Sequence, residues 1–232
     1  MPIALTRYAT LEHSQNHVHV ELSLPHQVVS SAVLNGGMVQ ANHIVNMKVP
    51  KSDPGAELPE LTLAKYCAES GWSGTAVGMM TAASMESFRM IKKSEQGIDI
   101  AALVTSGLSN PRRAGDHAEH RQMASHENPV GTINIIVITT ASLTASALIE
   151  ALLITTEAKS AALQETGILS PVSNKPATGT GTDSAAVVSG PGPGDVKYCG
   201  KHVLFGEFLG GLVIDAVSSS IQWAMAERVR CE

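Results

Sequence analysis

The sequence predicts an α/β or α+β fold: a single layered domain with a mixed sheet, two long helices and three layers at most. Apolar runs bounded by glycine alternate with segments of helical periodicity along the chain. Hydrophobic residues make up 44% of the chain but aromatic residues only 3%, so aliphatic side chains must build the core. The length of 232 residues suits one domain covering 1–232, and no linker or internal repeat divides it.

The first half of the chain is expected to form four strands and one helix. The segment HVHVELS alternates polar and apolar residues with a period of two, as in a half-buried strand. Two later runs are apolar, partly β-branched and bounded by glycine, which is typical of buried strands. The expected elements are strands at 17–23, 38–49, 74–82 and 97–107 and a helix from Glu60 to Gly71.

The second half is expected to form two strands and the two long helices. The most apolar stretch, 133–156, contains Glu150 and many hydroxyl groups, and its β-branched first part changes to helical periodicity. A strand followed by a helix therefore explains this stretch better than a membrane span does. The expected elements are strands at 131–139 and 184–190 and helices from about Leu143 to Glu165 and from His202 to Arg230.

Charge and cysteine usage narrow the class of protein. The net charge of -5 and the isoelectric point near 6.0 provide no basic surface for a phosphate backbone, so no nucleic-acid partner is expected. Cys67, Cys199 and Cys231 form no CxxC pair, which favours a reducing compartment over a disulfide framework or a thiolate zinc site. Because no signal peptide is recognisable at the start, a cytoplasmic protein is expected.

The stretch SNKPATGTGTDSAAVVSG, 173–190, contains a glycine-rich loop that ends on Asp183. It is not a phosphate-binding loop, because the pattern G-x-x-x-x-G-K-[ST] is absent and a carboxylate would repel a phosphate. Two interpretations are open. Either Asp183 caps a turn in a structural connection, or the glycines let the backbone approach a ligand toward which Thr180, Thr182 and Asp183 point.

Ionisable residues on the two long helices are further candidates. Lys159 shares a helix face with Leu148 and other apolar residues, so it is expected to be paired or to face a cavity, unless its stem reaches the surface. Glu207 lies on a stripe of small and apolar residues in the last helix. Lys201, His202 and Glu207 gather near the N-terminus of that helix, where the helix dipole favours an anion.

Two histidine pairs have spacings that would allow metal binding. His117 and His120 are three residues apart, and His17 and His19 lie on one side of a strand. Both pairs stand in polar segments, so solvated histidines are expected at these positions.

His43 and His202 are better ligand candidates, because they adjoin apolar or glycine-rich runs. Cys199 stands near His202 and is either a nucleophile activated by that histidine or a small buried hydrophobic residue.

Seven motifs follow one another along the chain: SSAVLNGGMVQANHIVNMKV, VGMMTAAS, VTSGLSNPRRAGD, GTINIIV, TTEAKSAALQE, TGTGTDSAAVVSG and YCGKHVLFGEFLG. In this order they resemble the adenosylcobinamide amidohydrolase family, the CbiZ type of corrinoid salvage enzyme, from about residue 30 to 211. The resemblance implies hydrolysis of the amide that joins aminopropanol to the corrin ring of adenosylcobinamide or a related corrinoid. The products would be adenosylcobyric acid and 1-aminopropan-2-ol, for cobalamin precursor salvage.

The residues that match the family motifs supply the candidates for the site, and the chemistry of amide hydrolysis assigns their roles. The catalytic candidates are Asp183, Glu207, His202 and Lys159. The candidates for substrate binding are Asn35, Gly36, Gly37, Asn110, Asn134, Thr180, Gly181, Thr182 and Lys201. The sequence departs from the family pattern at Cys199, where a smaller residue is expected, and at Val203, where a threonine is expected.

Amide hydrolysis requires an activated water, donors for the oxyanion and a proton for the leaving amine. Asp183 or Glu207 is the hypothetical general base, because small or apolar neighbours raise the pKa of a carboxyl group. His202 is the hypothetical proton donor. The oxyanion donors are expected among Lys159, Lys201, Asn35 and Asn134.

Two other mechanisms are open. No cofactor is certain, but His43, His202, Asp183 and Glu207 would suit a divalent metal. Alternatively, the chain cleaves itself before Thr132 to free an N-terminal nucleophile.

Rival functions are a non-catalytic corrinoid carrier or sensor of the same fold and an amidohydrolase for a different amide. A corrinoid is large, so a wide cleft is expected, with the polar segment from Pro111 to Pro129 as a mobile lid. The apolar closing helix would suit a homodimer interface.

Overall fold

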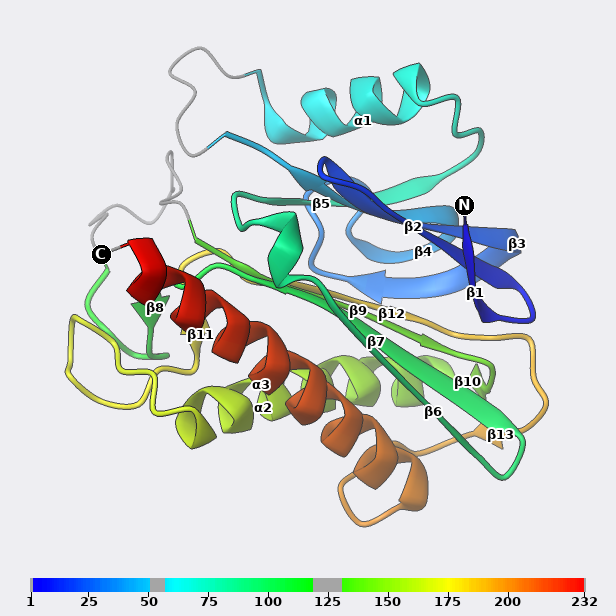
Figure 1. Cartoon of the computed structure of the whole chain (residues 1–232). Coiled ribbons are helices and arrows are strands. Elements are labelled where there is room, and N and C mark those ends of the chain that lie inside the picture. The colour runs from blue at the N-terminus through cyan, green and yellow to red at the C-terminus, as the bar shows by residue number, and fades with distance from the viewer. Residues whose placement is uncertain (1, 51–56, 119–130, 232) are drawn as a thin grey trace.

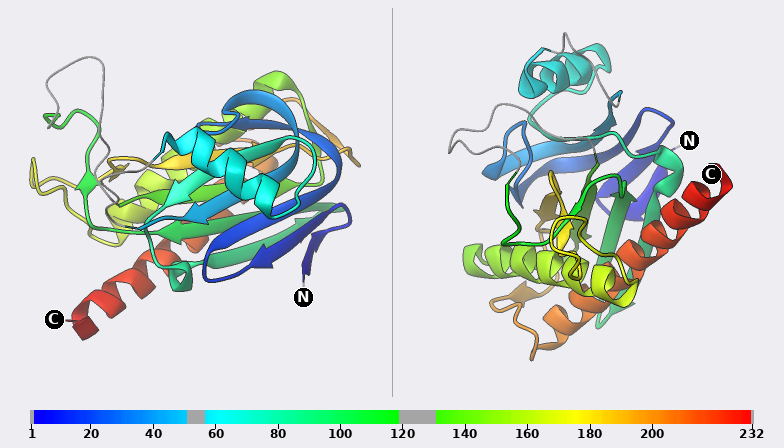
Figure 2. Two further views of the ribbon diagram at one scale, coloured as in Figure 1. Left: turned by 90° about the horizontal axis from the view of Figure 1, so that it is seen from above. Right: turned by 90° about the vertical axis from the view of Figure 1, so that its left-hand side faces the viewer.

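The computed structural model describes residues 2–50, 57–118 and 131–231. The chain forms four layers, with one helix, two layers of strands and two further helices stacked in that order (Figures 1 and 2). The mixed sheet and the long helices confirm the predicted fold class. The prediction of three layers at most is wrong, because the sheet doubles back on itself.

The first layer of strands contains the N-terminal part of the chain. Its strands are β1 (Ile3–Thr6), β2 (Ala9–His13), β3 (His17–Ser30), β4 (Gly37–Lys48) and β5 (Ala76–Thr81). The long strand β3 shifts register against β4 between Glu21 and His26. The first half of β3 pairs with β2, and its second half pairs with β12 of the next layer. This irregularity in β3 therefore joins the two layers.

The second layer of strands carries the candidate site. It consists of β6 (Arg89–Glu95), β7 (Ile98–Ser106), β9 (Ile133–Thr139) and β12 (Ser184–Val188). Strand β9 pairs in parallel with β12 and antiparallel with β7, so β9 lies in the middle of this layer. All seven residues of β9 are buried, which explains its continuous apolar and β-branched sequence.

Three hydrophobic clusters separate the layers. One lies between the two layers of strands and includes Ile44 and Ile136. A larger cluster lies between the second layer and the helices α2 (Ala145–Glu165) and α3 (Leu204–Cys231), and includes Leu148 and Leu212. A small cluster lies under helix α1 (Pro59–Glu69) and includes Leu63. The central strands β9 and β12 are thus covered on both faces.

Short elements tie the loops to this frame. The 3-10 turn η1 covers Met85–Ser87. Two small ladders join β8 (Pro111–Arg112) to β11 (Gly179–Thr180) and β10 (Ser142–Leu143) to β13 (Asp195–Val196). The β8 and β11 pair brings the glycine-rich loop beside the first residues of the expected lid.

The strands and helices expected from periodicity are confirmed, with boundaries shifted by a few residues except at β3, which continues to Ser30. Strands β1, β2 and β6 were not expected. Strand β6 has the sequence RMIKKSE, and it lies at the edge of the sheet with most of its residues exposed. An edge strand has one face and one side in water, so it lacks the apolar signal of a buried strand.

Helix α3 is long and apolar enough over Leu204–Glu227 to cross a membrane. Its residues Leu209, Leu212 and Val213 are fully buried against α2 and the sheet. These contacts are those of a core helix of the domain.

Candidate active site

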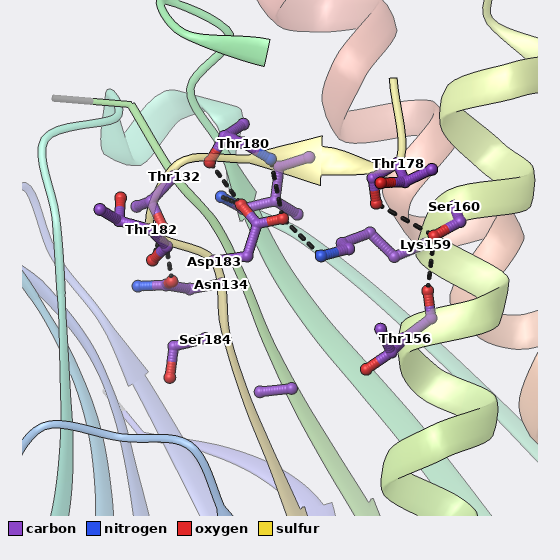
Figure 3. A network of polar contacts seen from close by, with 12 residues as sticks. Thr132, Asn134, Thr156, Lys159, Ser160, Thr178, Thr180, Thr182, Asp183 and Ser184 are labelled. Atoms are coloured by element: carbon purple, nitrogen blue, oxygen red, sulfur yellow. Dashed lines mark hydrogen bonds and ion pairs between the residues drawn. The ribbon is translucent and has the colours of Figure 1, made fainter. Parts of the chain in front are cut away.

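A buried ion pair between Lys159 and Asp183 forms the centre of the candidate site (Figure 3). Lys159 projects from α2, and Asp183 directly precedes β12. Their side chains are only 10% and 11% exposed. The helical spacing correctly placed Lys159 on the buried face of its helix. Its ammonium group does not extend freely into water, because it binds Asp183.

Asp183 accepts four donors, which fill both oxygens of its carboxylate. Oδ1 accepts from the backbone N–H of Ile133 at 2.9 Å and from the hydroxyl of Thr180. Oδ2 accepts from the backbone N–H of Thr180 at 2.9 Å and from Nζ of Lys159. The carboxylate therefore fastens three segments together: the start of β9, the glycine-rich loop and α2.

Gly179 allows β11 to pass directly over the ion pair. A Cβ atom at this position would lie 2.8 Å from Nζ of Lys159 and still closer to Oδ2 of Asp183. Asp183 accepts the backbone N–H of Thr180 within the loop, as the first interpretation expects of a capping residue. The close backbone approach of the second interpretation is present at Gly179. The group it approaches in this structure is the ion pair.

The backbone carbonyl of Gly131, just before β9, faces two threonine hydroxyls. The hydroxyl of Thr182 donates to this oxygen at 3.0 Å, and Oγ1 of Thr180 lies 2.9 Å from it. Thr132 follows directly, and its own hydroxyl lies 2.7 Å from the carbonyl oxygen of Thr182. The end of the sheet thus gathers three threonine hydroxyls beside the ion pair.

A chain of buried polar side chains runs from this site between the two layers of strands. Asn134 of β9 donates to Oδ1 of Asn46 at 2.7 Å and to the backbone carbonyl of Met80 at 2.8 Å. Asn46 in turn donates to the hydroxyl of Thr105 at 2.8 Å. Both amide hydrogens of Asn134 are therefore used, so its predicted role as an oxyanion donor would require this network to rearrange.

Sequence reasoning missed Asn46. Its signal was a single amide side chain within the otherwise apolar strand segment HIVNMKV. A buried polar residue in such a strand requires partners, and here the partners come from β7 and β9.

Asn110 differs from these satisfied amides. It is 7% exposed, and neither its Nδ2 nor its Oδ1 has a hydrogen-bond partner among residues 2–50, 57–118 and 131–231. It packs against Gly131, where a Cβ atom would overlap with Oδ1 of Asn110. A buried carboxamide that lacks a partner in the described part of the chain and lies near the threonine hydroxyls is a candidate for substrate contact.

The turn that contains Asn35, Gly36 and Gly37 lies at the same end of the sheet. The backbone N–H of Ser31, which precedes this turn, donates to Ala185 of β12 at 3.0 Å. The side chain of Asn35 donates to the backbone carbonyl of Ala76 at 2.8 Å, so it braces the turn. These predicted substrate-binding residues border the site and make no contact with Asp183 among the interactions of the described chain.

The three predicted residues near the start of α3 lie away from the ion pair. Lys201 forms an exposed pair with Glu157 of α2, which points away from the face that carries Lys159. His202 and Glu207 are exposed. The prediction that Glu207 lies on a buried stripe is wrong, because Leu209 and its buried neighbours turn the opposite face of α3 toward the core.

Part of the expected lid lies outside the described residues, as does His120. The described part, 111–118, is held to the body of the domain. Asp116 accepts from the hydroxyl of Ser170 and from the backbone N–H of Arg113, and these bonds lower the pKa of Asp116 to about 2. His117 is exposed, as expected.

The prediction that His17 and His19 are solvated is wrong. They are 9% and 4% exposed, because α1 and Trp72 cover this face of the sheet. His43 donates through Nε2 to the carbonyl of Ser73 at 2.9 Å, so its Nδ1 accepts from Nε2 of His19 at 3.1 Å. Burial, with the neighbouring histidines, lowers the pKa of His19 to about 3.

Acid is therefore expected to destabilise the fold. His19 has a pKa near 6.5 when unfolded, so between pH 6.5 and about pH 3 only the unfolded chain gains this proton. Lowering the pH from 7 to 5 should remove about 2 kcal/mol of stability through His19 alone. Urea unfolding at the two pH values tests this, with His19→Gln as the control that should flatten the slope. Equal pH dependence in both proteins would contradict the assignment.

Cys199 is buried beside Glu150, whose carboxylate accepts the Cys199 backbone N–H at 2.6 Å. Burial and this carboxylate raise the pKa of its thiol to about 12. Of the two alternatives for Cys199, the structure therefore favours the small buried hydrophobic residue over the nucleophile.

The predicted metal ligands do not gather. His43 contacts Ser73 and Trp72, Asp183 binds Lys159, and His202 and Glu207 are exposed near the start of α3. In the described ranges, no three His, Cys, Asp or Glu side chains come together in a way that would hold a metal ion.

Comparisons with known proteins identify sequence relatives. The model of a family described as adenosylcobinamide amidohydrolase matches residues 3–228. An adenosylcobinamide amidohydrolase of Methanosarcina mazei is 30% identical over 202 residues, which are 83% of this chain and 88% of the relative. An uncharacterized protein of Methanocaldococcus jannaschii is 33% identical over 157 residues, which are 62% of this chain and 61% of that protein.

Solved structures show a more distant likeness. A β-aminopeptidase of Burkholderia sp. has a TM-score of 0.43 and 14% identity, over 93% of this chain and 79% of its own. An L-aminopeptidase D-Ala-esterase/amidase of Ochrobactrum anthropi, described as a variant of the Ntn hydrolase fold, has a TM-score of 0.42 and 11% identity. That match covers 94% of this chain and 83% of the other.

Proposed function

Because the chain belongs to the adenosylcobinamide amidohydrolase family, we propose that it hydrolyses the amide that joins aminopropanol to the corrin ring of adenosylcobinamide. The products are adenosylcobyric acid and 1-aminopropan-2-ol, from which a cell can rebuild cobalamin. The protein is accordingly a hydrolase of a non-peptide amide.

The observation that carries this proposal is the buried centre of Lys159, Asp183 and the threonine hydroxyls at the ends of β9 and β12. Amide hydrolysis needs fixed donors aimed at the position where negative charge develops. Hydroxyl groups and an ammonium group held in a site with little water supply such donors.

Lys159 is proposed to bind a substrate oxygen. An ammonium group has three N–H donors, and Asp183 accepts one of them. The ammonium makes no other hydrogen bond within the described residues, so two of its donors are left for a ligand. A positive charge at this position would stabilise the oxyanion of the tetrahedral intermediate.

Asp183 is proposed to position its neighbours and not to act as the general base. Its carboxylate already accepts from two backbone N–H groups, one hydroxyl and one ammonium group. These donors stabilise the ionised form and leave no lone pair directed at a water molecule.

Asn110 is proposed to bind a carboxamide of the corrin periphery. Its unpaired Oδ1 and Nδ2 are one acceptor and one donor on the same side chain. A primary carboxamide offers the complementary donor and acceptor, so the two groups can form a pair of hydrogen bonds. This pairing would offset the cost of burying Asn110 unsatisfied.

Two further predictions accompany this function. A cytoplasmic location agrees with the two buried free thiols of Cys67 and Cys199. A homodimer interface on α3 agrees with the exposed apolar side chains of Met225 and Val229.

The direct test is to incubate the purified, chelator-treated protein with adenosylcobinamide and to identify products by chromatography and mass. Adenosylcobyric acid and 1-aminopropan-2-ol are expected in equal amounts. Tight corrinoid binding without product would instead favour a carrier or sensor. Activity that returns only with a divalent ion would favour the metal mechanism.

A further inference from the structure

We propose that the chain cleaves its own backbone between Gly131 and Thr132, and that the freed Thr132 is the nucleophile for amide hydrolysis. The cleavage stands on the geometry around this peptide bond. The second role of Thr132 rests also on the proposed function.

The carbonyl group of Gly131 is held as the carbonyl of a scissile bond would be. The Thr182 hydroxyl donates to this oxygen at 3.0 Å and has no other acceptor among the described residues. Oγ1 of Thr180 lies 2.9 Å from the same oxygen, although its one proton is shared with Asp183. Donors at these distances stabilise the oxyanion that forms when a nucleophile adds to a carbonyl carbon.

The backbone on both sides of Thr132 is fixed. Gly131 has a φ of +136°, and a Cβ atom there would overlap with Ser109 Oγ and Asn110 Oδ1, so no other residue fits without a shift. On the other side, the N–H of Ile133 binds Asp183 at 2.9 Å. The peptide bond between these anchors is therefore held in one orientation against the threonine hydroxyls.

The hydroxyl of Thr132 is itself buried and oriented. The residue is 3% exposed, and its Oγ1 lies 2.7 Å from the carbonyl oxygen of Thr182 and 3.0 Å from Oδ1 of Asn134. Thr132 and Lys159 lie on two sides of Asp183 (Figure 3). The Thr180 and Thr182 hydroxyls thus surround the Gly131 carbonyl oxygen, the buried Thr132 hydroxyl follows in the chain, and the Lys159 ammonium lies beyond them on Asp183.

Self-cleavage needs water as its only co-reactant. Oγ1 of Thr132 attacks the carbonyl carbon of Gly131, and its proton passes to the departing nitrogen of Thr132. The C–N bond breaks and leaves an ester between the two residues. Water hydrolyses this ester, which yields the carboxylate of Gly131 and a Thr132 with a free hydroxyl and a free α-amine.

Substrate hydrolysis then repeats the same chemistry. The α-amine of Thr132 takes the proton of its hydroxyl while Oγ1 attacks the amide carbonyl of adenosylcobinamide. 1-Aminopropan-2-ol departs with that proton, and the corrinoid acyl group remains bound to Thr132 as an ester. Water hydrolyses the ester and releases adenosylcobyric acid.

The two fragments would stay together after cleavage. Strand β9 of the second fragment pairs with β7 of the first, and β12 pairs with β3. Cleavage is therefore expected to leave the elution volume of the folded protein unchanged and to be visible only after denaturation.

The test is the intact mass and denaturing gel of the purified full chain, followed by N-terminal sequencing. Two fragments, 1–131 and 132–232, are expected, and the second should begin Thr-Ile-Asn. Thr132→Ala should stay intact, and Thr132→Ser should cleave. Thr182→Val should slow cleavage on the order of 10²-fold. Thr156→Val is the matched control and should cleave as the unaltered chain does, because within the described part of the chain the exposed Thr156 hydroxyl binds only its own helix.

Each outcome decides one question. An intact unaltered chain that still forms adenosylcobyric acid would overturn self-cleavage and leave the proposed function standing. A cleaved chain without hydrolytic activity would support self-cleavage and overturn the proposed function. Cleavage of Thr132→Ala at the same bond would show that Thr132 is not the nucleophile and overturn the inference.

Discussion

Lys159→Met lowers the free energy of unfolding by about 3 kcal/mol in our account, because it leaves the carboxylate of Asp183 buried without its cation. The three other donors to Asp183 keep the loss at the lower end of the range for broken buried pairs. Urea unfolding followed by circular dichroism measures the change.

Lys201→Met is the matched control for this prediction. It removes the same kind of cation from the exposed pair with Glu157, whose contribution should stay below about 1 kcal/mol. The double variant Lys159→Met/Asp183→Asn should be more stable than the sum of its single effects predicts, since neither charge is then left unpaired. Equal small losses for both lysine variants would show that water screens the Lys159 pair.

Gly179→Ala is expected to disrupt the Lys159 and Asp183 ion pair from the side of β11. The added methyl group would lie 2.8 Å from Lys159 Nζ and closer to Asp183, so either β11 or the ion pair must move. Overpacking of this kind costs about 1–3 kcal/mol. We expect hydrolysis of adenosylcobinamide to fall on the order of 10²-fold, since the displaced donors no longer meet the oxyanion.

Gly211→Ala provides the control for this glycine. Apart from the backbone of its own helix, no atom of the described residues lies within 4 Å of a Cβ at position 211 in α3, so alanine should stabilise the helix by about 0.5–1 kcal/mol and leave turnover unchanged. If Gly179→Ala also left turnover unchanged, the close approach of β11 to the ion pair would have no functional role.

The elements of this fold were readable from the sequence because their signals are local. The β-branched run of β9 and the helical spacing around Lys159 each lie within one element. Lys159 was correctly expected on a buried face. That Asp183 is its partner was not predictable, because the path of the loop between α2 and β12 decides which side chain meets the ammonium group.

Errors arose where a second layer decides the burial. The alternation of β3 predicted one solvated face, yet α1 and Trp72 cover His17 and His19 on that face. Glu207 was placed on the wrong side, because the first turn of α3 is apolar nearly all round and gives no preferred face. Spacing along one element carries no information about what packs against it.

Turnover of two variants shows where in the molecule the amide is hydrolysed. We would measure kcat/KM on adenosylcobinamide for Thr182→Val, at the buried centre, and for His202→Ala, at the exposed start of α3. A loss on the order of 10²-fold for Thr182→Val, with His202→Ala within a few fold of the unaltered protein, is the predicted result. The reverse pattern would place the reaction at the start of α3 and contradict the account.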